Sequence, residues 1–137
     1  MRFIATAILA AAATLAGCAT PIDPAINEEA KRPLLCAAGL DCDAKWDAAQ
    51  LWIVKNAGWK LQTSTTVVLQ TFGPSTAVND SLRIAVTVTR EPEGPGQYRI
   101  KISARCGNPF GCTVEPMAAI ADFKRYVNAV GTTVASR

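Results

Sequence analysis

The chain has 137 residues, of which 14 are basic and 11 acidic, and its formal net charge is +3 at pH 7. A balance this close to neutrality argues against a nucleic-acid-binding protein, and we expect no such partner. The chain has no histidine, which excludes Ser-His-Asp and Cys-His catalysis and the usual zinc hydrolase sites. We therefore expect a protein that is not an enzyme, although catalysis by two carboxylates stays open.

The N-terminal segment 1–17 has the pattern of a secretory signal peptide. A short positive start, Met1-Arg2, precedes an apolar run from Phe3 to Leu15. The run is too short to cross a bilayer, which takes about 20 apolar residues. The segment ends in two small residues, Ala16 and Gly17, directly before Cys18.

The sequence Leu15-Ala16-Gly17-Cys18 resembles the lipobox of bacterial lipoproteins. The resemblance implies that residues 1–17 are removed and that Cys18 carries a thioether-linked diacylglycerol and an N-acyl chain, with no other cofactor. It also implies the outer membrane, on the periplasmic face, rather than the inner membrane, because Ala19 replaces the aspartate that favours inner-membrane retention. The alternative is an ordinary signal peptide cleaved near Ala19, with Cys18 unmodified.

Four further cysteines form two pairs with equal spacing: Cys36 and Cys42, and Cys106 and Cys112. An even count in an exported chain indicates disulfides. We favour the two local bridges, each of which would stabilise the fold by about 2 kcal/mol through loop entropy. A bridge from Cys36 to Cys106 would contribute about 4 kcal/mol and is also compatible with the spacing. A four-cysteine zinc site would need shorter spacings within each pair.

The mature chain is predicted to hold one small domain, residues 34–137, behind a flexible linker. The linker, 18–33, contains three prolines and a charge cluster without apolar periodicity. A first helix is expected over 43–57, followed by Gly58 in the left-handed conformation. Its apolar positions recur at helical spacing: Trp46, Ala49, Ile53 and Ala57.

Three strands are expected next. The first spans 59–72, where β-branched residues are frequent and a bend is expected at Thr63–Thr66. The second and third, 82–89 and 98–105, alternate apolar and polar residues and form a hairpin. A second helix is expected over 116–130. The predicted fold is α+β, a two-layer domain in the order α-β-β-β-α, with a three-stranded antiparallel sheet covered by two helices.

The polar face of the predicted hairpin is the candidate binding face. Arg83, Arg99, Lys101 and Arg105 point to it, and no acidic residue lies within the predicted strands. A solvated sheet face is the simpler interpretation. The functional interpretation is a basic platform for an envelope protein or an anionic envelope component.

Two stretches, 52–71 and 105–112, resemble segments of small proteobacterial lipoproteins of unassigned activity, and the layout is loosely similar to accessory lipoproteins of outer-membrane protein assembly. Neither resemblance implies a site. The expected function is a non-enzymatic accessory or binding role at the membrane. The alternative is a binding module for peptidoglycan or lipopolysaccharide, in which Trp52 and Tyr98 provide aromatic surfaces.

Overall fold

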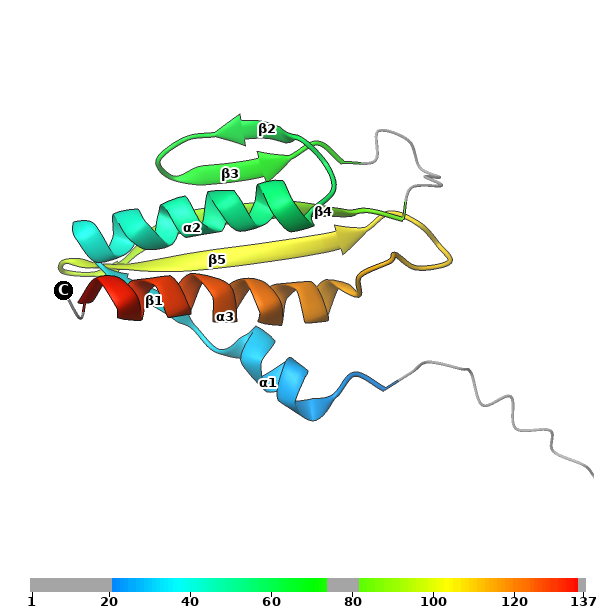
Figure 1. Ribbon diagram of the computed structural model, residues 1–137, viewed down its shortest axis with the longest axis horizontal. Coiled ribbons are helices and arrows are strands. Elements are labelled where there is room, and N and C mark those ends of the chain that lie inside the picture. The colour runs from blue at the N-terminus through cyan, green and yellow to red at the C-terminus, as the bar shows by residue number, and fades with distance from the viewer. Residues whose placement is uncertain (1–20, 74–81, 136–137) are drawn as a thin grey trace, which may run out of the picture.

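The computed structural model describes residues 21–73 and 82–135, and Figure 1 shows their arrangement. In chain order the elements are α1 (Pro24–Lys31), β1 (Leu34–Ala37), α2 (Leu40–Asn56), β2 (Leu61–Ser64), β3 (Val68–Thr71), β4 (Ile84–Gly94), β5 (Gln97–Cys106) and α3 (Pro116–Ala135).

The sheet has five antiparallel strands in the order β1-β5-β4-β3-β2. The prediction of three strands and two helices in the order α-β-β-β-α was therefore wrong. The segment expected as one strand over 59–72 folds into the hairpin β2–β3. At its turn the Thr65 hydroxyl accepts a hydrogen bond of 2.9 Å from the Val68 amide, so the expected bend in the threonine run reverses the chain.

Strand β1 and helix α1 are the elements that the prediction missed. β1 pairs with β5, where Leu34 lies opposite Ile100. β1 has only four residues, which is too few for an alternating pattern to be recognised in the sequence. Helix α1 lies within 18–33, where we expected a flexible linker, and the folded part of the chain begins before residue 34. Asp23 caps it by accepting from the Ala25 amide at 2.8 Å.

Helix α1 is held against α3. Its Ala30 is buried, and the Lys124 ammonium on α3 donates to the carbonyl oxygens of Ala30 and Arg32. Desolvation by the surrounding protein lowers the pKa of Lys124. The end of α1 is thereby fixed to the rest of the domain.

The alternation predicted for the hairpin is confirmed in β4 and β5. Ile84, Val86, Val88 and Ile100 are buried on one face of the sheet. β4 continues beyond the predicted end at Thr89 to Gly94, and its partner strand starts at Gln97. The hairpin is therefore longer than predicted.

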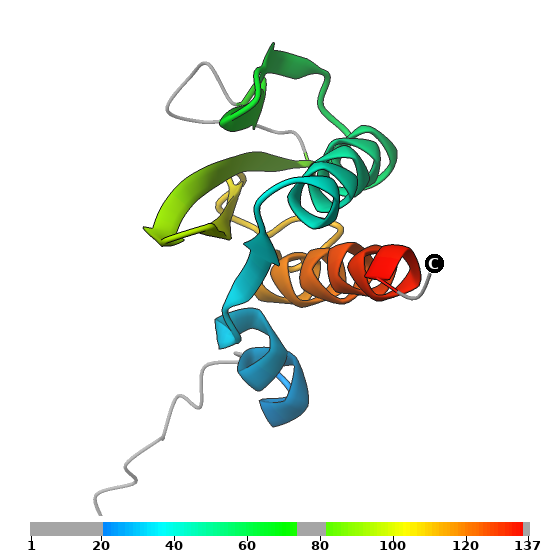
Figure 2. The same ribbon diagram turned by 90° about the vertical axis from the view of Figure 1, so that its left-hand side faces the viewer.

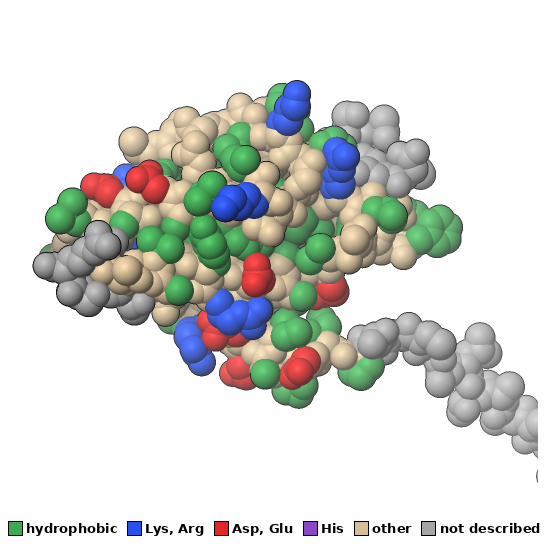
Figure 3. Space-filling view, in the orientation of Figure 1, with side chains coloured by type: hydrophobic (Ala, Val, Ile, Leu, Met, Phe, Trp, Pro, Cys, Tyr) green, Lys and Arg blue, Asp and Glu red, His purple; other side chains and the backbone are tan. Residues whose placement is uncertain are grey.

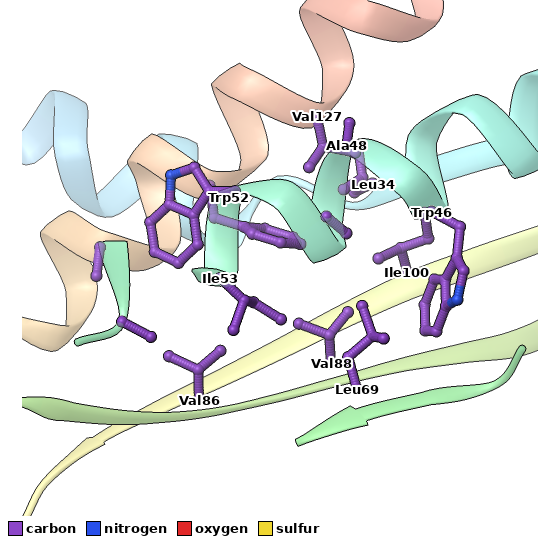
Figure 4. Packing of buried hydrophobic residues seen from close by; sticks show 14 of the residues in the cluster. Leu34, Trp46, Ala48, Trp52, Ile53, Leu69, Val86, Val88, Ile100 and Val127 are labelled. Carbon is purple, nitrogen blue, oxygen red and sulfur yellow. The ribbon is translucent and has the colours of Figure 1, made fainter. Parts of the chain in front are cut away.

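Helices α2 and α3 cover this apolar face of the sheet (Figure 2). The predicted apolar positions of α2 are buried, and on α3 Phe123 and Val127 are buried. These residues belong to one cluster with side chains of the sheet. Figure 4 shows Ile53 of α2 above Val86 and Val88 of β4. The Trp52 and Phe123 rings meet edge to face, with centroids 5.3 Å apart, so the two helices also pack on each other.

The four cysteines form the two local disulfides. Cys36–Cys42 joins β1 to α2 and lies in the core. Cys106–Cys112 closes the loop after β5, where its half-buried sulfurs lie near the surface. Gly58 follows α2 with φ +77°, as predicted, and a side chain there would meet Arg83 Cγ at 3.1 Å.

Candidate functional site

The face of the sheet opposite α2 and α3 carries no helix among the described residues (Figure 2). We call it the outer face. Its side chains come from alternate positions of the three central strands. They are Gln70 on β3, Thr87, Thr89 and Glu91 on β4, and Arg99, Lys101, Ser103 and Arg105 on β5.

Two of the four predicted cations on this face are neutralised. Lys101 pairs with Glu91, and Arg99 pairs with Glu93. The predicted strands contain no acidic residue, but β4 extends beyond its predicted end through both glutamates. The hydrogen bonds from Lys101 and Thr89 lower the pKa of Glu91. The half of the outer face near the β4–β5 turn is therefore a paired, nearly neutral surface.

Arg83 lies just before β4, beside Trp59. Its guanidinium is 6.0 Å from the Trp59 ring centroid, a cation–π distance. Both residues line a recess of about 520 Å³ together with Lys60, Phe72 and neighbouring glycines. Arg83 lies beyond the end of β4 that is farther from the β4–β5 turn, whereas Lys101 lies near the middle of the hairpin and Arg99 nearer the turn.

Arg105 is the predicted cation without an ion-pair partner within residues 21–73 and 82–135. It is exposed and lies opposite Ala85 near the end of β5. A recess of about 330 Å³ lies beside it, and its lining is mostly polar. The lining residues include Gln62, Gln70, Phe72, Gly73, Thr87 and Arg105. We call this hollow the Arg105 recess.

The two recesses share Phe72 and Gly73. The structure therefore brings Arg83 and Arg105 to one end of the sheet and leaves Arg99 and Lys101 toward the other. The amides and hydroxyl of the Arg105 recess can both donate and accept hydrogen bonds. With the Arg105 guanidinium, which has no ion-pair partner in the described ranges, this end can bind a phosphate or a carboxylate.

Arg90 is a cation that sequence reasoning missed. It lies on the helix side of the sheet, 5.4 Å from the Trp46 ring centroid and 5.7 Å from that of Tyr98, and it pairs with Asp43 at 3.4 Å. Continuing the alternation of β4 one residue beyond Thr89 would have placed it on the apolar face. Its contacts hold the aromatic end of the core together.

The aromatic surface expected of Trp52 and Tyr98 is not formed. Trp52 is only 2% exposed, and its indole Nε1 donates to Asp122. It lies under a hollow of about 320 Å³ between α2 and α3 that Tyr98 does not line. Tyr98 is half-buried beneath Arg90. The two rings therefore share no ligand surface.

Cys18 lies outside the residues that the structure describes. Searches among protein-family models, curated proteins and solved structures found no match to the chain. Among the described helices, none has the length and apolar character needed to cross a bilayer.

Proposed function

We propose that this chain is a lipid-anchored lipoprotein of the outer membrane that faces the periplasm and binds an anionic envelope component in a non-enzymatic accessory role. The observation that carries the binding role is the Arg105 guanidinium, which has no ion-pair partner among the described residues and lies beside a polar recess on the outer face. The lipobox-like sequence ending at Cys18 supports the anchor. Two or more acyl chains on one residue give stable anchoring.

The anchor is tested by intact mass spectrometry of the membrane fraction. We expect a chain that starts at Cys18 and carries acyl groups. Cys18→Ser is expected to abolish acylation and to release the protein from the membrane fraction. A wild-type chain with an unmodified Cys18 would refute the anchor.

The binding role is tested on the full acylated chain in detergent, titrated with inorganic pyrophosphate by calorimetry. A charge-assisted hydrogen bond contributes about 1.5–3 kcal/mol, so Arg105→Gln is expected to weaken binding at least about tenfold. Lys101→Gln removes the same charge from a paired position of the same strand and is expected to change affinity less than about twofold. Equal losses in both variants, or no binding by the wild type, would refute the site.

A further inference from the structure

The end of the domain that carries Arg105 also gathers exposed apolar side chains. Phe110 is 97% exposed, and Leu82 and Phe72 are about half exposed. Figure 3 shows hydrophobic side chains projecting at this end of the molecule. Large exposed apolar residues in one place mark a surface that contacts a partner or a membrane.

The loop that carries Phe110 is held in an exposed conformation. The Cys106–Cys112 disulfide closes it, and the Asn108 side chain accepts from the Phe110 amide at 2.8 Å. After the loop, the Thr113 amide donates to the Leu82 carbonyl oxygen at 2.9 Å. These bonds hold the Phe110 loop beside Leu82, and both side chains are exposed there.

Helix α1 lies below α3, and its N-terminal end points toward the same end of the long axis as this loop (Figure 1). Only Ala19 and Thr20 separate Cys18 from Pro21, a span of at most about 11 Å in a fully extended chain. Ile22, beside this point, is also exposed. Because Lys124 and Ala30 fix α1 to α3, an acylated Cys18 would hold this end of the domain close to the bilayer.

The charges of the two ends differ in a way that fits this orientation. Lys60, Arg83 and Arg105 line the recesses at the Phe110 end, where the carboxylates of Asp23 and Glu115 cap helices. The opposite end, around the β4–β5 turn and the start of α2, carries four carboxylates. They are Asp41, Asp43, Glu91 and Glu93. Each of these carboxylates is paired with a lysine or an arginine, so the opposite end is nearly neutral. An anionic surface therefore attracts the Phe110 end more strongly than the opposite end.

We infer that the Phe110 end is a membrane-binding surface: Phe110, Phe72 and Leu82 enter the interface of the bilayer that holds the lipid anchor, and the Arg105 recess binds the phosphate of an anionic phospholipid. The inference rests on the proposed function, and it names the ligand of the same recess. Aromatic and apolar side chains at the headgroup level, flanked by basic residues, are the pattern of interfacial binding.

The test uses the full acylated chain in cells, with a photo-crosslinking phenylalanine analogue at position 110 or at position 40. Leu40 is the matched control, because it is 79% exposed at the opposite end. We expect a phospholipid adduct on the peptide containing residue 110, at least about fivefold more abundant than at residue 40. A protein adduct at 110, equal lipid adducts at both positions, or none at either would overturn the inference.

The role of Arg105 is tested in vesicles that contain either phosphatidylcholine alone or an added third of phosphatidylglycerol. In the anionic vesicles, Arg105→Gln is expected to lower the adduct at 110 several-fold, whereas Lys101→Gln changes it less than about twofold. Equal effects of the two variants would refute phosphate binding by Arg105. Acylated protein that binds pyrophosphate but gives no lipid adduct at 110 would refute the membrane-binding surface alone and leave the proposed function standing.

Discussion

The indole Nε1 of Trp52 on α2 donates a hydrogen bond of 2.8 Å to Oδ2 of Asp122 on α3. Trp52 is buried, so its N–H cannot form a hydrogen bond with water instead. The carboxylate, by contrast, is partly exposed and also contacts Arg125 at 3.6 Å. The helix pair is thus joined by a polar contact at the edge of its apolar interface.

Asp122→Ala is expected to destabilise the protein by about 1–3 kcal/mol, because it leaves the buried indole N–H without a partner. Asp122→Asn keeps an acceptor oxygen and is the control, with an expected cost below about 1 kcal/mol. The measurement is urea unfolding of both variants beside the wild type. Equal stabilities of the Ala and Asn variants would contradict this role of the hydrogen bond.

Trp46 and Trp59 offer a matched pair of substitutions. Each ring lies against an arginine, but Trp46 Nε1 donates to the Thr65 carbonyl oxygen at 3.0 Å, whereas Trp59 Nε1 is buried without a partner among the described residues. Trp46→Phe is expected to cost about 1 kcal/mol more than Trp59→Phe, since the second substitution removes an unsatisfied donor. Thermal unfolding of the two variants measures the difference, and a larger loss for Trp59→Phe would contradict it.

The Glu91 carboxylate predicts a dependence of stability on acid pH. The hydrogen bonds from Lys101 and Thr89 lower its pKa below the usual 4.5. Just below pH 4.5 the folded state therefore binds fewer protons than the unfolded state. The stabilisation by the ionised Glu91 carboxylate is present above that pH and is lost as the pH falls through the folded-state pKa.

Glu91→Gln is expected to flatten the rise of stability with pH below the usual carboxyl pKa of 4.5. The measurement is the urea midpoint at several pH values, with Glu28→Gln on α1 as the control. High salt should reduce the effect, because the Lys101–Glu91 pair is exposed. An unchanged slope in Glu91→Gln would show that the pair makes no contribution.

The two disulfides are expected to differ in what they stabilise. Removing either bridge, as Cys36→Ala with Cys42→Ala or Cys106→Ala with Cys112→Ala, loses about 2 kcal/mol of loop entropy. The first pair also leaves a defect in the core, where both residues are buried, so its total cost should be larger. The second pair should instead increase cleavage at the Phe110 loop by chymotrypsin. A lower stability of the second variant would contradict this order.

The elements with a long, clear period could be predicted from the sequence. The buried stripe of α2 and the alternation of β4 and β5 both appear in the burial of the residues named for them. Strand β1 and helix α1 could not, because four and eight residues carry too little periodicity. They are stabilised by contacts with β5 and α3, which are distant in the sequence.

The candidate site was only partly predictable for a related reason. The alternation placed Arg99, Lys101 and Arg105 on one face, as observed. Which of them is neutralised depended on the length of β4, because the extended strand brings Glu91 to Lys101 and Glu93 to Arg99. The extension of β4 could not be predicted from the sequence Glu91–Gly96, because its prolines and glycines are typical of loops.

The attachment of α1 to α3 also determines where mechanical load would enter the domain. A pull on a lipid-bound N-terminus reaches α1 first, and there it acts on the bonds from Lys124. If these bonds break, the force acts next on β1, which contains Cys36. The Cys36–Cys42 bridge then transmits the force covalently into α2. Strand β1 can therefore detach from β5 while the loop between Cys36 and Cys42 stays closed and is not extended. The remaining four strands and two helices would stay folded as the load-bearing part.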